Sequence, residues 1–109
     1  MTRRSVRFVV ALAVLFIATI TFAQSGNVVI YRVGDGSAAL SSAATPVFLD
    51  EYTPAGALVR TITMPTAVSG SNKPLTAAGT SASEGLLTRS ADGRYLVLAG
   101  YAATPGTAG

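Results

Sequence analysis

Carboxylates and hydroxyls are the main groups through which this chain could do chemistry, because its 109 residues include neither cysteine nor histidine. Without thiolate or imidazole groups, the sequence excludes Cys/His zinc sites and catalytic triads with a histidine base. It also excludes disulfides, so the stability of the fold has to come from packing. The remaining candidates are acids, hydroxyls and a single lysine.

Asp50 and Glu51 are adjacent carboxylates within a predicted strand. Successive side chains of a strand point to opposite faces, so these two cannot flank one glycosidic bond as the acids of a hydrolase do. We expect Asp50 and Glu51 to lie at a solvated end of the strand.

Asp35, in Val-Gly-Asp-Gly, could offer an oxygen to calcium, but Ca²⁺ takes about 6 to 8 oxygen ligands and no second acid lies near in sequence. Asp35 is therefore expected to be a turn residue.

Ser69, Ser71 and Lys73 have the residue types of a serine–lysine nucleophile pair. Their spacing is not Ser-x-x-Lys, and the surrounding stretch has the composition of a polar linker. We therefore predict no catalytic, cofactor-binding or metal-binding residue and no cofactor. Whether the protein is an enzyme is left open by the sequence, which favours a non-enzymatic role.

The first 23 residues have the pattern of an export signal peptide, predicted as a signal helix. Arg3, Arg4 and Arg7 precede an apolar stretch from 8 to 20, and small residues at Thr21 and Ala23 predict cleavage after Ala23. The apolar segment 8–23 has 16 residues (23 − 8 + 1), short of the about 20 that span a bilayer, although an uncleaved anchor is the alternative. The predicted location is periplasmic or secreted, with no membrane attachment after cleavage.

Removing this segment also removes the positive charge of the chain. The formal net charge is +3 over 109 residues, and three arginines with no acids leave with residues 1–23, so the rest is neutral (3 − 3 = 0). The remaining bases are scattered singly, whereas nucleic-acid binding requires a clustered basic surface. We expect no nucleic-acid partner.

Residues 24–109 are predicted to be all-β, because five stretches are rich in β-branched and aromatic residues and are bounded by turn formers. These stretches are Asn27–Val33, Val47–Tyr52, Ala57–Met64, Gly85–Ser90 and Tyr95–Tyr101. Two of the connections, Thr53–Gly56 and Ser90–Gly93, fit type I turns that end in a left-handed glycine and close antiparallel hairpins. The Ser/Thr/Ala/Gly-rich segment 65–83 is predicted to be a loop.

The first and last of these strands are apolar on both faces, so we expect both to be covered on both sides. The first, Asn27–Val33, has no obvious hairpin partner within reach. We expect it to present an unpaired edge, through which copies of the chain could associate.

The segment VFLDEYTPAGALVRTITMP, residues 47–65, resembles the outer two strands of a blade in secreted bacterial β-propellers. The segment SEGLLTRSADGRYLVLAGY, residues 83–101, is similar to the inner two strands of the following blade. The resemblance implies a partial propeller-like domain over 24–109. Propellers have about 4 to 8 blades of about 40 to 45 residues each, so the 86 residues after the signal (109 − 23) amount to one to two blades, as in a fragment of a longer protein.

A small complete sandwich or barrel is the alternative fold. For function, the resemblance implies a propeller-like binding or structural module of the cell envelope or medium. The alternative is the N-terminal part of an exported hydrolase or lactonase-like propeller enzyme whose active site lies in further blades.

Overall fold

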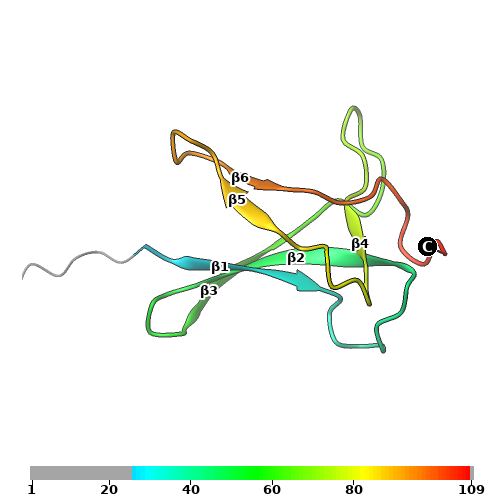
Figure 1. Ribbon diagram of the computed structural model, residues 1–109, viewed down its shortest axis with the longest axis horizontal. Coiled ribbons are helices and arrows are strands. Elements are labelled where there is room, and N and C mark those ends of the chain that lie inside the picture. The colour runs from blue at the N-terminus through cyan, green and yellow to red at the C-terminus, as the bar shows by residue number, and fades with distance from the viewer. Residues whose placement is uncertain (1–25, 109) are drawn as a thin grey trace, which may run out of the picture.

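The computed structural model describes residues 26–108, and these form antiparallel β-strands without any helix (Figure 1). The all-β prediction is confirmed for this range. The predicted signal helix over 1–23 lies outside the described residues. Within the described range there is no helix that could cross a membrane.

Three strands form the central sheet in the order β1-β2-β3, namely β1 (Val28–Val33), β2 (Ala44–Tyr52) and β3 (Leu58–Thr63). All six residues of β1 pair with β2, from Val28 opposite Tyr52 to Val33 opposite Val47. The expectation that the first strand lacks a hairpin partner within reach is therefore wrong, but β1 is terminal in the order β1-β2-β3, so the expectation of an unpaired edge holds among the described strands. The loop 34–43 is too long to give the turn signal of a tight hairpin, but it still returns the chain antiparallel to β1.

The strand β2 begins three residues earlier than predicted, and those residues pair with a strand that the sequence did not indicate. Ala44–Pro46 lie opposite β4 (Thr76–Ala78), which falls inside the segment predicted to be a loop over 65–83. Thr76 and Ala77 are fully buried. Their small side chains lack the usual composition of a strand, but they allow β4 to pack closely in a buried position.

Both predicted turns are present, and both end in a left-handed glycine. In the first, the Gly56 amide donates to the Thr53 carbonyl at 2.9 Å and Gly56 has a φ of 85°. In the second, the Gly93 amide donates to the Ser90 carbonyl at 2.8 Å and Gly93 has a φ of 72°. The two hairpins close differently. The Thr53 amide donates to the carbonyl of Ala57, four residues later, whereas the Ser90 amide donates to the carbonyl of Tyr95, five residues later.

The second hairpin, β5 (Leu87–Arg89) and β6 (Leu96–Leu98), forms its own two-stranded sheet. It lies across the central sheet (Figure 1), where Gly85 approaches the ring of Tyr31 and a groove between the layers is lined by Val29 and Leu87. After β6, Tyr101 exchanges two backbone hydrogen bonds with Thr76, which attaches the chain to β4.

The core is small and lies where β2 meets β4. Val47, Leu49 and Ala77 are its buried apolar residues. The expectation that β1 and the last strand are covered on both faces is wrong within residues 26–108, because Ile30 and Val97 are each about half exposed. The two layers approach each other at Gly85 and the Tyr31 ring, and an open groove lies between Val29 and Leu87.

Candidate functional site

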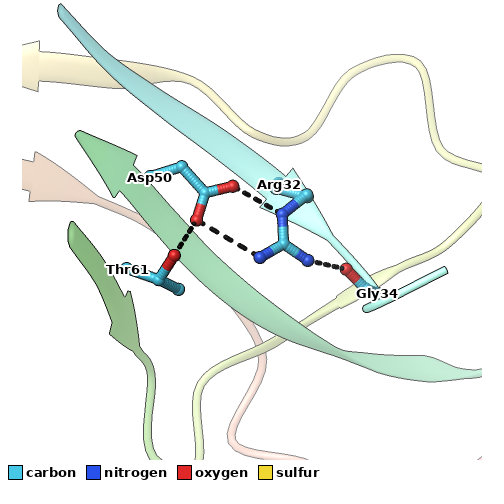
Figure 2. Close-up of polar contacts among 4 residues, drawn as sticks. All are labelled: Arg32, Gly34, Asp50 and Thr61. Atoms are coloured by element: carbon cyan, nitrogen blue, oxygen red, sulfur yellow. Dashed lines mark hydrogen bonds and ion pairs between the residues drawn. The ribbon is translucent and has the colours of Figure 1, made fainter. Parts of the chain in front are cut away.

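A buried carboxylate on the central sheet is the most highly organised polar group of the described residues (Figure 2). Asp50 lies on the middle strand β2, between Arg32 on β1 and Thr61 on β3. The Arg32 guanidinium donates from Nε to Asp50 Oδ2 at 2.6 Å and from Nη2 to Oδ1 at 3.2 Å. The Thr61 hydroxyl donates to Oδ1 at 2.6 Å.

The arginine of this cluster is held from three sides. Its Nη1 donates to the Gly34 carbonyl at 2.7 Å, and its Cζ lies 4.5 Å from the centre of the Phe48 ring. The planar guanidinium can satisfy a bidentate carboxylate, a backbone carbonyl and an aromatic face together. Its position is therefore fixed by the sheet itself.

These contacts stabilise the charged forms of both partners. Hydrogen bonds from Arg32 and then Thr61 hold the pKa of Asp50 below its ordinary value, against the opposing effect of desolvation. The hydrogen bond to Asp50 raises the pKa of Arg32. A carboxylate whose oxygens are both occupied by donors is a poor proton acceptor, so the cluster has the chemistry of a structural ion pair.

The prediction of a solvated strand end is therefore wrong for Asp50, which is only 5% exposed. The prediction that Asp50 and Glu51 point to opposite faces is confirmed by their separate partners. Glu51 accepts hydrogen bonds from Asn27 at 2.7 Å and from Arg60 at 2.6 Å. The amide of Asn27, and then the Arg60 guanidinium, lower the pKa of Glu51.

A second polar cluster joins β4 to the end of the β5–β6 hairpin. Glu84 Oε2 accepts a hydrogen bond from the Ala78 amide at 2.8 Å, and Oε1 accepts one from the Tyr101 hydroxyl at 3.1 Å. That hydrogen bond, and then the negative charge of Glu84, raise the pKa of Tyr101. The carboxylate thus connects two segments that are far apart in sequence.

Tyr31 lies beneath this cluster, on the face of the sheet that the hairpin covers. Its hydroxyl oxygen is buried and has no hydrogen-bond partner among the described residues. Burial, and then the charge of Glu84, raise the pKa of Tyr31. This phenol remains protonated at neutral pH.

The other sequence candidates occupy turns. Asp35 Oδ1 accepts hydrogen bonds from the amide and the hydroxyl of Ser37, at 2.9 and 2.6 Å, which confirms it as a turn residue. Ser69 and Asn72 form a tight turn that is closed by two 3.0 Å backbone hydrogen bonds and contains Ser71. Lys73 follows it and is exposed. The described residues contain no group of three metal-ligating side chains.

Sequence reasoning missed the clusters around Asp50 and Glu84. The signal for the first was a charge inside each of two apolar runs, Arg32 in the first predicted strand and Asp50 in the second. Only the strand register, in which Arg32 lies opposite Phe48 and Asp50 opposite Ile30, brings the two charges into contact. Glu84 gave no such signal, because its partners Ala78 and Tyr101 lie in segments without a predicted pairing.

The fold and these clusters define a small antiparallel β protein in which charged groups hold strands together. Comparisons of the chain with protein-family models, curated proteins and solved structures find no match.

Proposed function

We propose that this chain is an exported binding or structural module of the cell envelope or medium, built from hairpins like those of a β-propeller. Residues 1–23 support the export part of the proposal, since they combine an arginine-rich start, an apolar stretch and a small-residue cleavage site. The resemblance over 47–65 and 83–101 supports the propeller-like part. Two hairpins with related turns lie in adjacent layers, which is compatible with neighbouring blades.

The observation that carries the proposal is the exposure of large apolar side chains on both layers and on their loops. Twelve large hydrophobic residues of the described range are exposed, among them Leu86 at 80% and Tyr95 at 60%. Large exposed apolar patches are typical of sites that contact another molecule. The proposed function is accordingly to bind the surface of another protein molecule.

Strand edges offer a second route to contact. In the order β1-β2-β3 the strand β3 is terminal, and all six of its residues are exposed. A terminal strand presents unpaired backbone groups that can pair with another strand. Self-association through such an edge remains part of the proposal.

In vivo photocrosslinking of the full-length chain, expressed in a bacterial host, tests the function. A photoreactive residue replaces Val97 on the hairpin, with Ser71 in the exposed turn as the matched control position. A contact module in the envelope or medium gives discrete adducts from position 97 and none from position 71. Recovery of the chain only from the cytoplasm, or equal labelling at both positions, would overturn the proposal.

A further inference from the structure

Two aspartates of the chain are followed directly by glycine, in the pairs Asp35–Gly36 and Asp92–Gly93. An aspartate in this position can rearrange its own backbone, because the amide nitrogen of the next residue can attack the side-chain carboxyl group. Glycine favours the attack, since it has no Cβ to obstruct the ring that forms. At each pair, the surrounding structure decides whether this reaction can proceed.

The reaction requires no reagent other than water. The glycine nitrogen forms a bond to the aspartate Cγ while the C–OH bond of the protonated carboxyl group breaks, and the hydroxyl leaves as water with the amide proton. Water then opens the resulting succinimide ring. Addition at Cγ restores aspartate, whereas addition at the α-carbonyl carbon breaks the original peptide bond, returns a proton to nitrogen and leaves isoaspartate. Nothing is oxidised or reduced.

The turn at Asp92 holds both reacting groups. The Gly93 amide donates to the Ser90 carbonyl at 2.8 Å, and the Gly93 carbonyl accepts from Arg89 Nε at 2.9 Å. Asp92 Oδ1 accepts hydrogen bonds from the Ser90 hydroxyl at 2.6 Å and from the Arg94 amide at 3.1 Å. The Gly93 nitrogen has to lose its proton to attack, and a proton in a hydrogen bond is released only when that bond opens.

At Asp35 only the carboxylate is held. Its Oδ1 accepts hydrogen bonds from the amide and the hydroxyl of Ser37, at 2.9 and 2.6 Å. The Gly36 amide, in contrast, donates no hydrogen bond to any residue within the described range 26–108. An added Cβ at Gly36 would meet nothing within 4 Å, and residues 35–42 of this loop are all exposed. Little packing therefore opposes the rotation that brings Cγ of Asp35 to the Gly36 nitrogen.

The two carboxylates themselves do not distinguish the two pairs. Hydrogen bonds from the hydroxyl and the amide of Ser37 hold the pKa of Asp35 below its ordinary value. Hydrogen bonds from the Ser90 hydroxyl and the Arg94 amide do the same for the pKa of Asp92. Both groups are thus mainly in the charged, unreactive form at neutral pH, which makes the reaction slow at either position. The difference lies in the glycine amide.

We infer that Asp35 is a site of spontaneous covalent modification, at which the Gly36 amide closes a succinimide and isoaspartate accumulates, while the turn at Gly93 protects Asp92. The reaction depends only on the loop after β1 and therefore does not require export.

The modification acts beside the Arg32–Asp50 ion pair. Isoaspartate at position 35 adds a carbon to the main chain directly after Gly34. The Gly34 carbonyl accepts a hydrogen bond from Arg32 Nη1 at 2.7 Å, and the Gly34 amide donates to the Pro46 carbonyl at 2.8 Å. The side-chain carboxyl carbon becomes part of the main chain, so the hydrogen bonds that Asp35 accepts from Ser37 are lost. The change thus alters the chain at the end of β1.

Peptide mapping of the protein purified after full-length expression, incubated folded at neutral pH, tests the inference. Fragmentation in the mass spectrometer distinguishes isoaspartate from aspartate at each position, because the additional main-chain carbon changes the fragments. Isoaspartate should accumulate at least about tenfold faster at position 35 than at position 92, since the hydrogen bond of Gly93 has to open first. In denaturant, which removes the turn, the two positions should react at similar rates.

Asp35→Glu and Asp35→Asn are the matched variants, and Asp92 is the internal reference in both. Glutamate would have to close a larger ring, so Asp35→Glu should give no product at position 35. Asparagine closes the same succinimide from an uncharged side chain and releases ammonia, so Asp35→Asn should form isoaspartate faster than the wild type.

Equal rates at the two positions of the folded protein, or a faster rate at position 92, would overturn the inference. So would a lack of product at position 35 over a period in which the denatured chain forms it, because the contacts with Ser37 would then be sufficient for protection.

Discussion

At the scale of single residues, Asp50 shows how a strand can contain a charge without exposing it. Arg32 and Thr61 reach it from the two neighbouring strands, so the carboxylate links all three strands of the sheet. Its removal would leave the guanidinium of Arg32, which rests on Phe48, without its main acceptor. A half-buried guanidinium that loses its carboxylate partner and keeps only the Gly34 carbonyl as acceptor destabilises the sheet that holds it.

We predict that Asp50→Asn lowers the thermal unfolding midpoint at neutral pH by several degrees, and that this difference disappears in acid. The folded pKa of Asp50 lies below its unfolded value of about 3.9. The contribution of ionised Asp50 to the stability of the fold is therefore fully present above the unfolded pKa. It is lost as the pH falls through the folded pKa. Unfolding of wild type and variant, compared between neutral and acidic pH, measures this. Asp35, Glu51 and Asp92 also have lowered pKa values, and because the variant keeps all three residues, the comparison isolates Asp50. A difference that is independent of pH would contradict the prediction.

The sequence predicted which side chains could ionise, but not which of them would meet. Alternation was enough to place Asp50 and Glu51 on opposite faces, because that depends only on neighbouring residues. Burial of Asp50 depends on the register between β1 and β2, which joins residues 18 positions apart. Local pattern carries no information on that register when the connecting loop lacks a tight-turn signal.

At the scale of elements, the turns were predicted well because their requirement is local. Gly56 and Gly93 adopt positive φ, which other residues rarely adopt. The pairing of β4 with β2 was not predictable in the same way. Thr76 and Ala77 are buried through contacts with distant segments, and small polar and alanine residues look like a loop when read locally.

We predict that Gly56→Val and Gly93→Val each destabilise the fold by about 1 to 3 kcal/mol, because a β-branched residue is strained at positive φ. At Gly56 the space around an added Cβ is open, so the cost there comes from the backbone alone. Chemical denaturation measures the change. Gly26→Val is the matched control, since Gly26 has open space and no positive φ, and it should be neutral. A Gly56→Val protein as stable as the control would refute the turn conformation.

The two layers should also differ in their resistance to opening. The central strand β2 contains the buried Val47 and Leu49, whereas most residues of the β5–β6 hairpin are exposed. Segments with few buried apolar contacts open at lower free energy than the core. We predict that native-state hydrogen exchange gives the slowest amides in β2 and faster exchange in β5 and β6. Equal protection across both layers would show instead that the molecule opens as one unit.

At the scale of the whole molecule, the large apolar side chains are divided between a small core and an exposed surface. Val47, Leu49 and Ala77 are buried, while Ile30, Tyr95 and others remain open to solvent. Such a core supplies modest stability by itself. A further β layer packed on this surface would bury it and increase the stability of both layers.

Export and charge can be tested together on the whole chain. We predict that the full-length chain, expressed in a bacterial host, is recovered outside the cytoplasm with Gln24 as its first residue, because small residues precede it at Thr21 and Ala23. Cleavage removes three arginines and no acid, so the formal net charge falls from +3 to 0 (3 − 3). Isoelectric focusing should therefore place the exported product near neutrality, and N-terminal sequencing should locate the cut. Ala23→Arg disrupts the cleavage site and should leave a longer, strongly basic product, which serves as the control. A product that begins at Met1, or recovery confined to the cytoplasm, would show that residues 1–23 are not a cleaved signal.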